Sequence, residues 1–361
     1  METVRKCAGK GQLARCWLGR VVLAIALLLQ VCSGAAAGAG VDAAPPSNGS
    51  QACTAYGDPP RPTVASSEDG TLNAMLDTVL NACAIMAGEV LDWTDANGTP
   101  RQACLVAPRW ASTARPLPLL VWLHPTLVAQ DAILVTGLPQ LVRSGNLSGN
   151  PLHPGFILLL PAARDIEQFL PAPLNAGIGW DHWYRNLDRS SPDLNVDVAA
   201  IDHFVQVTEQ RGIVDPKRVY VSGWSEGADM ATLYGLNTPG VAATAVYSTI
   251  TPFADPADPC PGPAFASNST RPYYLMVREC DTGDACPAGQ EFLDQLRSGV
   301  LAPELVHGVI LNSGTRPVTV CNRLCTGNSP LAQVLSQQQH THWPLQWNNE
   351  LFAFLRDNPE P

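Results

Sequence analysis

The chain is poor in positive charge. Lysine occurs only three times in 361 residues, and Lys217 is the only lysine beyond the basic N-terminal segment. Without Glu2 and the five basic residues of the first 37 positions, 17 basic and 31 acidic residues remain, a net charge of about −14. No basic cluster interrupts this acidic composition. The chain therefore lacks the electrostatic features of a protein that binds nucleic acid or an anionic membrane, and we expect neither as a partner.

Closely spaced cysteine pairs of the C-x2-C type are also absent. Eleven cysteines are present, and three of them fall within the first 37 residues. The remaining eight are Cys53, Cys83, Cys104, Cys260, Cys280, Cys286, Cys321 and Cys325. Their spacings fit a zinc site poorly, whereas an even number in an exported chain indicates disulfides. We expect no metal or cofactor, and bridges that close the local loops 280–286 and 321–325.

The N-terminus has the order of a secretory signal peptide. Five basic residues precede an apolar run at 21–31, which is followed by small residues at 33–37. The run is too short to span a bilayer comfortably, so a signal anchor is the lesser alternative. We expect residues 1–37 to be a signal peptide cleaved near Ala37, a secreted product, and no stable membrane span. An irregular Pro/Ala/Gly-rich lead-in at 38–70 and one large domain at 71–361 should follow.

Apolar strands alternate with amphipathic helices through this domain. Residues 71–115 should contain a helix and then a β-hairpin around Asn97-Gly98. Continuous apolar runs at 116–124 and 156–160 are typical of strands that are buried on both faces of a parallel sheet. Further strands are expected at 241–247, 273–277 and 306–311, and further helices at 195–211 and 348–356. The pattern predicts an α/β fold, with a mostly parallel central sheet and helices on both faces.

A serine stands at the centre of the most informative segment. Residues 218–231 read RVYVSGWSEGADMA, so β-forming residues pass through Gly223-Trp224-Ser225-Glu226-Gly227 into helix-forming ones. In a strand–turn–helix elbow, only small residues two positions before and after the serine let strand and helix approach closely. Glycine occupies both positions. The segment predicts a nucleophile at Ser225, and the alternative is a serine in an ordinary βα turn.

A serine nucleophile needs a base, and the base needs a third group that fixes its tautomer. Asp281 lies just past the expected strand 273–277 and is the preferred acid, ahead of Asp284 and Glu279. The histidines after Ser225 are His307, His340 and His342. His307 enters an expected strand and is more simply structural. His340 and His342 lie in an expected loop before the last helix, and both remain candidates for the base.

The tetrahedral oxyanion of such a reaction needs backbone N–H donors. One should be the amide of Glu226, at the start of the helix. The other should come from the loop after strand 116–124, where Pro125 has no N–H and Thr126 is the candidate donor. We interpret His124 as a residue that orients this loop.

Five segments stand out, scattered across most of residues 115–361, namely LVWLHPT, GWDHWYRN, VDVAAIDHF, VDPKRVYVSGWSEGADMA and HTHWP. Together they resemble the polyhydroxybutyrate depolymerase and feruloyl esterase-like branch of the α/β-hydrolases. The resemblance implies the α/β-hydrolase fold and a secreted serine esterase with Ser225, Asp281 and His340 as its triad. It favours His340 over His342 because the family usually leaves one or two residues between the base and Trp-Pro. Pro125, where the family has glycine, and the additional His342 depart from the pattern.

Aromatic residues cluster before the helix at 195–211, namely Trp180, His182, Trp183 and Tyr184. They either line an ester-binding groove or pack in the core. Trp180 and Trp224 are the candidate substrate-binding residues. The resemblance implies a secreted serine carboxylesterase of the polyhydroxybutyrate depolymerase type, acting through an acyl-enzyme. The alternatives are a feruloyl or acetyl esterase acting on plant polysaccharide, and a catalytically silent hydrolase fold used as a binding module.

Overall fold

The computed structural model describes residues 81–126, 129–167, 176–180, 196–249, 252, 271–281, 285–299, 301–322, 325 and 329–361. The expected signal peptide and lead-in lie outside the described residues, as does most of the expected N-terminal helix. Asp284, Cys53, Cys260 and the segment 182–184 also lie outside them. Within the described part, no helix is both long enough and apolar enough to cross a bilayer.

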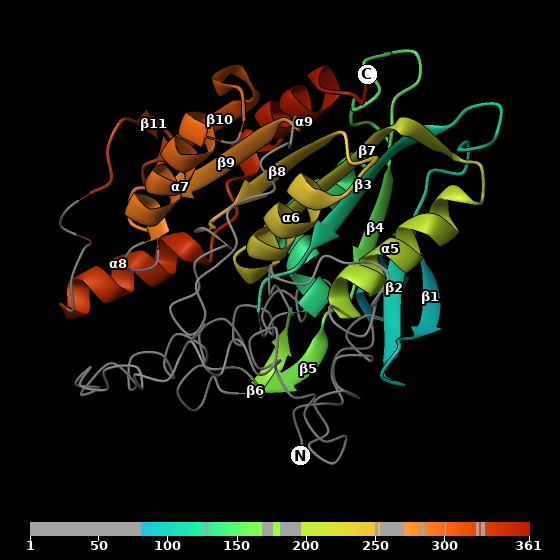
Figure 1. The fold of residues 1–361 in the computed structure, drawn as a ribbon, viewed down its shortest axis with the longest axis horizontal. Coiled ribbons are helices and arrows are strands. Elements are labelled where there is room, and N and C mark those ends of the chain that lie inside the picture. The colour runs from blue at the N-terminus through green and yellow to red at the C-terminus, as the bar shows by residue number, and fades with distance from the viewer. Residues whose placement is uncertain are drawn as a thin grey trace, which may run out of the picture.

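The described residues form a nine-stranded sheet with the order β1-β2-β4-β3-β7-β8-β9-β10-β11 (Figure 1). Its strands are β1 (Glu89–Thr94), β2 (Pro100–Val106), β3 (Leu117–Leu123), β4 (Ile157–Pro161), β7 (Val214–Trp224), β8 (Ala243–Tyr247), β9 (Tyr273–Arg278), β10 (Val306–Leu311) and β11 (Pro317–Val318). The central strands from β4 to β10 are parallel, whereas β1, β2 and β11 are antiparallel additions at the two edges. A separate two-stranded ribbon consists of β5 (Arg164–Glu167) and β6 (Ala176–Gly179).

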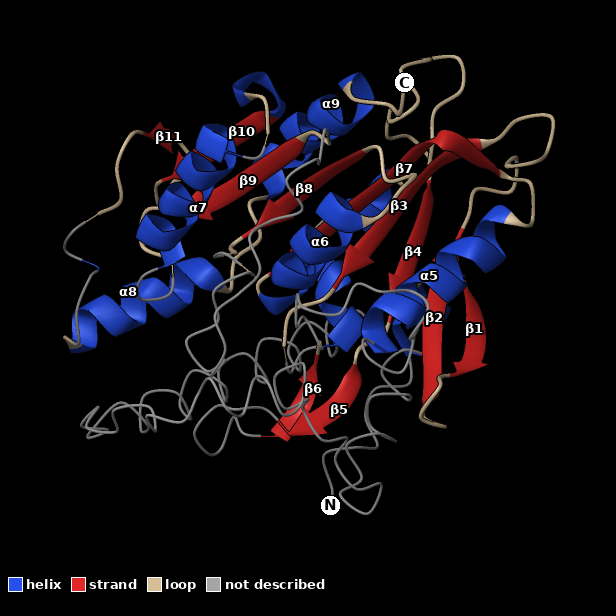
Figure 2. Ribbon diagram, viewed as in Figure 1, coloured by secondary structure: helices blue, strands red, loops and turns tan. Residues whose placement is uncertain are grey.

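Helices cover both faces of the sheet (Figure 2). One face carries α5 (Val196–Glu209), α6 (Glu226–Asn237) and α7 (Ala285–Gly299), and the other carries η3 (Ala129–Val135), α4 (Leu138–Leu141) and α9 (Asn348–Asp357). The remaining helical segments are η4 (Pro303–Leu305), α8 (Pro330–His340) and η6 (Leu345–Trp347). The predicted α/β architecture is confirmed.

Strand β3 shows why helices cover both faces of the sheet. All seven of its residues are buried. Leu119, Val121 and Leu123 pack into the core cluster of α5 and α6, whereas Leu120 and Trp122 pack into the cluster of α4 and α9. Successive side chains of a strand point to opposite faces, so an unbroken apolar run fits a strand that is buried on both faces.

Three disulfides tie the described chain, Cys83–Cys104, Cys280–Cys325 and Cys286–Cys321. The predicted local loops 280–286 and 321–325 are therefore wrong. The segment after β11 runs beside the segment after β9, where the N–H of Asn322 donates to the carbonyl of Glu279 at 2.9 Å. Each cysteine consequently faces a partner across the two segments. Disulfides of this kind form and persist in an oxidising compartment.

Candidate active site

Ser225 stands at the sharp turn between β7 and α6, with φ 57° and ψ −129°. A positive φ is uncommon for a residue other than glycine. A Cβ on Gly223 would lie 2.1 Å from the carbonyl oxygen of Gly227, and a Cβ on Gly227 would lie 2.3 Å from that of His124. Both contacts are with backbone, which cannot move aside. The two glycines thus let α6 begin directly against the ends of β7 and β3, which is the elbow of the α/β-hydrolase fold.

The structure brings His340 and Asp281 to this serine. The Nε2 atom of His340 lies 2.9 Å from Ser225 Oγ, and its Nδ1 atom lies 2.7 Å from Asp281 Oδ1. The Asp281 side chain is fully buried and that of His340 is 22 % exposed. In this arrangement the imidazole can take the serine proton while the carboxylate supports the imidazolium that forms.

The other candidates lie elsewhere. His342 is exposed, and its Nδ1 atom lies 2.6 Å from the carbonyl oxygen of Gln338. His307 is on β10, with Nε2 3.0 Å from the carbonyl oxygen of Glu304. Glu279 lines a separate pocket, described below. Of the three histidines, it is His340 that contacts Ser225.

His340 is the last residue of helix α8, so the expectation that it lies in a loop is wrong. The helix begins with Ser329 as its N-cap, whose side chain accepts a hydrogen bond from the N–H of Ala332 at 3.1 Å, and with Pro330 in its first turn. A serine followed by proline is a helix-start signal that the sequence does contain. The helix lies beyond the carboxyl ends of β8 and β9 (Figure 1), and so carries its final residue to Ser225.

Backbone carbonyls on both sides of His340 are held by side chains from three neighbouring strands. Tyr247 OH lies 2.7 Å from the carbonyl oxygen of Gln339 and 3.0 Å from that of His342, and its single hydrogen is shared between the two. The indole N–H of Trp224 donates to the carbonyl of His340 at 3.0 Å, and Arg278 donates to that of His342 at 3.2 Å. Burial holds the pKa of Tyr247 well above its ordinary value, so its hydroxyl keeps the proton that it donates. The base is thus oriented through the main chain.

Gln339 also joins the base to the acid. Its side-chain oxygen accepts a hydrogen bond from the N–H of Cys280 at 3.1 Å, next to Asp281. The Cys280–Cys325 disulfide anchors the same segment. The hydrogen bond ties the acid-bearing segment directly to the residue before the base, and the disulfide ties that segment to Cys325.

The loop after β3 contacts the elbow through Thr126. The hydroxyl of Thr126 donates to the carboxylate of Glu226, the residue after Ser225. This contact brings the two expected oxyanion donors, Thr126 and Glu226, into adjacent positions. Their backbone roles in catalysis stay a prediction.

His124 also holds the loop after β3 in place. It is fully buried, and burial lowers its pKa from the ordinary 6.5 to about 4, against the smaller opposing effect of its contact with Pro125. The ring is therefore neutral, with Nδ1 donating to the carbonyl of Pro125 at 2.9 Å and Nε2 accepting from the N–H of Ala163 at 3.0 Å. Both ring nitrogens are used in structural contacts. This agrees with the interpretation of His124 as a residue that orients the loop.

Acid is expected to destabilise the fold through His124. Between about pH 6.5 and 4 the unfolded chain binds a proton at this residue and the folded chain does not, so lower pH favours unfolding. The free energy of unfolding should fall by about 2.4 kcal/mol between pH 7 and 4.5 from this group alone. Urea unfolding at both pH values measures the loss. His124→Gln, which cannot titrate, should show a smaller loss, and an equal loss in both proteins would contradict the assignment.

A buried ion cluster supports the segment that meets His124. Arg101 lies between Asp95, at 3.3 Å, and Asp197 at the start of α5, and all three side chains are fully buried. Arg101 also donates to the carbonyl of Ala162 at 3.3 Å, next to Ala163. The pairing and this hydrogen bond offset part of the cost of burying these charges.

The two tryptophans predicted to bind substrate are both buried, with Trp180 1 % and Trp224 5 % exposed. The indole N–H of Trp180 donates to the carbonyl of His124 at 2.8 Å, as that of Trp224 does to His340. Trp180 therefore supports the loop after β3, and Trp224 supports the end of helix α8 at the base. Their contact with substrate stays a prediction.

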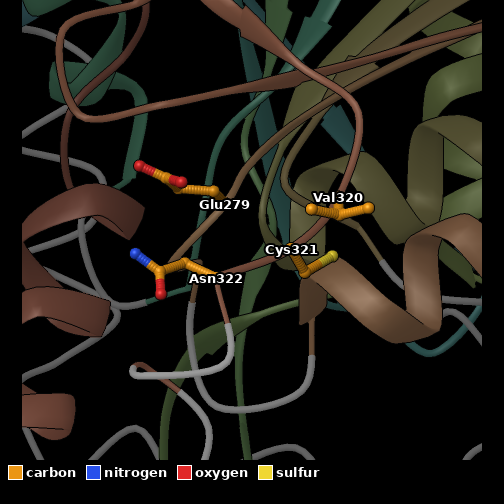
Figure 3. Close-up of a pocket in the computed structure, with 4 residues that line it drawn as sticks. All are labelled: Glu279, Val320, Cys321 and Asn322. Atoms are coloured by element: carbon orange, nitrogen blue, oxygen red, sulfur yellow. The ribbon is translucent and has the colours of Figure 1, made fainter.

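A pocket of about 500 Å³ lies beside the acid-bearing segment, lined by Glu279, Val320, Cys321 and Asn322 (Figure 3). Figure 3 shows Glu279 and Asn322 on one side and Val320 with Cys321 on the other. Among the described residues, no group of three or more His, Cys, Asp or Glu side chains is arranged to hold a metal ion.

Three residues near the base were not singled out from the sequence: Tyr247, Ser248 and Arg278. Tyr247 and Arg278 are the last residues of β8 and β9, and Ser248 follows β8 directly. In parallel sheets, functional groups gather at the carboxyl ends of the strands. That rule, applied to the expected strands 241–247 and 273–277, is the signal that would have found them.

No protein-family model matches the sequence, and no curated protein matches it. Solved structures with a similar course of the chain include a thermostable esterase, with 14 % identity, a TM-score of 0.43, and coverage of 76 % of this chain and 63 % of that one. Esterase Est22 has 13 % identity and a TM-score of 0.43, with coverage of 88 % and 94 %. AtxE2 isopeptidase has 17 % identity and a TM-score of 0.40, with coverage of 76 % and 41 %. This chain thus spans less than two thirds of the thermostable esterase and of the isopeptidase, and likenesses this distant carry no inference about activity.

Proposed function

We propose that this protein is a secreted serine carboxylesterase that works through an acyl-enzyme. The observation that carries the proposal is the continuous contact from Ser225 Oγ to His340 Nε2 and from His340 Nδ1 to Asp281. The signal-peptide pattern and the disulfides support export.

The first half of the reaction forms the acyl-enzyme. Ser225 Oγ attacks the ester carbonyl carbon while His340 Nε2 takes the hydroxyl proton. The tetrahedral intermediate places its negative oxygen toward the N–H groups of Glu226 and Thr126. His340 then gives its proton to the departing alkoxide, the C–O bond breaks, and the alcohol leaves with the acyl group bound to Ser225.

The second half regenerates the enzyme. Water attacks the acyl carbon as His340 takes one of its protons, and a second tetrahedral intermediate forms at the same site. Its collapse returns the proton to Ser225 and releases the carboxylic acid. Asp281 stays ionised throughout and stabilises the imidazolium in both halves.

The expected substrate class is a polyester of the polyhydroxybutyrate type, which rests on the sequence resemblance. A panel of 4-nitrophenyl butyrate, polyhydroxybutyrate film and methyl ferulate separates the alternatives. We expect hydrolysis of the butyrate and clearing of the film, with labelling of Ser225 by a fluorophosphonate probe located by peptide mapping. Ferulate cleavage without film clearing would favour the polysaccharide esterase. A folded protein that neither labels nor hydrolyses any ester would be a binding module, and the proposal would fail.

A further inference from the structure

Ser248 contacts the same ring nitrogen of His340 as Asp281 does. Its Oγ atom lies 2.7 Å from His340 Nδ1, equal to the distance from Nδ1 to Asp281 Oδ1. Ser248 is 4 % exposed and follows the last residue of β8. The base therefore has two oxygen atoms at Nδ1, and Ser225 Oγ at Nε2.

The backbone of Ser248 is fixed in an unusual conformation. Its φ is 62°, in the left-handed region that favours glycine. Its N–H donates to the carbonyl of Met276 on β9 at 2.8 Å, just as the N–H of Ser225 donates to the carbonyl of Tyr247 on β8 at 3.1 Å. Two successive strand ends thus each present a serine at positive φ, one on each side of the His340 ring.

The tautomer of His340 decides what Ser248 does. If Nε2 is to take the Ser225 proton, it must carry none in the resting state, so the single ring hydrogen is on Nδ1. Ser248 Oγ and Asp281 Oδ1 must then both accept from this one N–H, in a three-centre hydrogen bond. Ser248 keeps its own proton.

We propose that Ser248 is a positioning residue, which shares the Nδ1–H of His340 with Asp281 and holds the ring with Nε2 directed at Ser225. The inference rests on the proposed function and adds a fourth member to its catalytic group. When the ring becomes an imidazolium, the Nδ1–H bond strengthens, and both acceptors stabilise the positive charge. The ionisable groups in contact with this region are Asp281 at Nδ1, and Tyr247 and Arg278 at the neighbouring carbonyls.

Removing the hydroxyl tests the proposal in Ser248→Ala and Ser248→Gly. Glycine suits the positive φ, so Ser248→Gly should fold at least as well as the parent, and a loss of activity in it is not caused by unfolding. We expect kcat on 4-nitrophenyl butyrate to fall about tenfold with KM little changed. The acidic limb of the pH profile of kcat/KM should move about half a pH unit lower. Loss of the Ser248 oxygen removes more stabilisation from the protonated His340 ring than from the neutral ring.

The matched control is Ser222→Ala. Ser222 is also a fully buried serine near the elbow, on β7, but its hydroxyl has no hydrogen-bond partner within the described part of the chain. It should leave kcat and the pH profile unchanged. A drop in kcat for the Ser248 variants without any shift of the acidic limb would mean a merely structural role and would overturn the proposal, as would unchanged kinetics.

Two further measurements separate this proposal from the esterase proposal. Ser248→Ala should lower kcat about a hundredfold in the Asp281→Ala background, against tenfold alone, because the last acceptor at Nδ1 is then lost.

Independently of activity, ¹⁵N NMR of the His340 ring reports which nitrogen carries the proton. We expect the Nδ1–H form in the parent and a mixture in Ser248→Gly. If the tautomer in Ser248→Gly were the same as in the parent, the Ser248 inference would be overturned even if the protein is an active esterase. If the parent were inactive on esters but the tautomer changed as expected, only the esterase proposal would be overturned.

Discussion

Ser225→Ala should lower kcat on 4-nitrophenyl butyrate by about a million-fold, the scale seen when a triad nucleophile is removed. The variant lacks the only atom that can form the acyl-enzyme in the proposed mechanism. Ser248 cannot replace it, since its hydroxyl lies at Nδ1 of His340, where no proton can be taken from it. Initial rates at high enzyme concentration, with fluorophosphonate labelling in parallel, measure the loss.

The fold should survive this substitution. Alanine has the same Cβ as serine at the positive φ of the elbow, so thermal unfolding should shift by only about 2 °C or less. Ser222→Ala serves again as the control, with full activity and full labelling. Turnover in Ser225→Ala within tenfold of the parent would exclude this residue as the nucleophile and with it the proposed mechanism.

His340→Ala and His342→Ala should differ by several orders of magnitude. The first removes the general base and should cost about 10⁵- to 10⁶-fold in kcat, because Ser225 is then a weak nucleophile. The second removes an exposed ring, whose described contacts are with the carbonyl of Gln338 and the hydroxyl of Thr341, and should change kcat by less than about threefold. Steady-state kinetics on the same ester compare the two directly.

Each substitution is the control for the other, because the two positions are two residues apart and both changes replace an imidazole side chain by a methyl group. Circular dichroism should show the same helix content for both proteins. If His342→Ala alone abolished hydrolysis, the contact between His340 and Ser225 would not be the working one. If both variants kept activity, the base would have to be sought outside this segment.

The elbow and the central sheet could be predicted because their determinants are local. The glycines two positions before and after Ser225 are required because any side chain there would clash with neighbouring backbone. A requirement of this kind can be recognised from the sequence, since it fixes the residue type at a fixed spacing from the serine. The apolar run of β3 likewise follows from burial on two faces. Asp281 could be placed because it follows the apolar run 273–277, which marks the strand from the sequence alone.

Features that depend on the meeting of distant segments could not be predicted in the same way. The cysteine pairing follows from the path of the chain after β9 and β11, which spacing alone does not record. The large apolar residues of helix α8, Leu331, Val334 and Leu335, lie in its first half and are followed by the polar run SQQQ, so the apolar pattern is too short to predict a helix that reaches His340. Ser248 is a single small residue, and its relation to His340 exists only after the chain has folded.

The way in which the main chain around the base is held has a consequence for the HTHWP segment. Tyr247 and Arg278 donate hydrogen bonds to the backbone carbonyl oxygen of residue 342, and all twenty amino acids possess this group. Position 342 is therefore fixed in space yet nearly free in chemical identity. We therefore expect the geometry of the base to be preserved when the second imidazole, which made the sequence ambiguous, is replaced by another side chain.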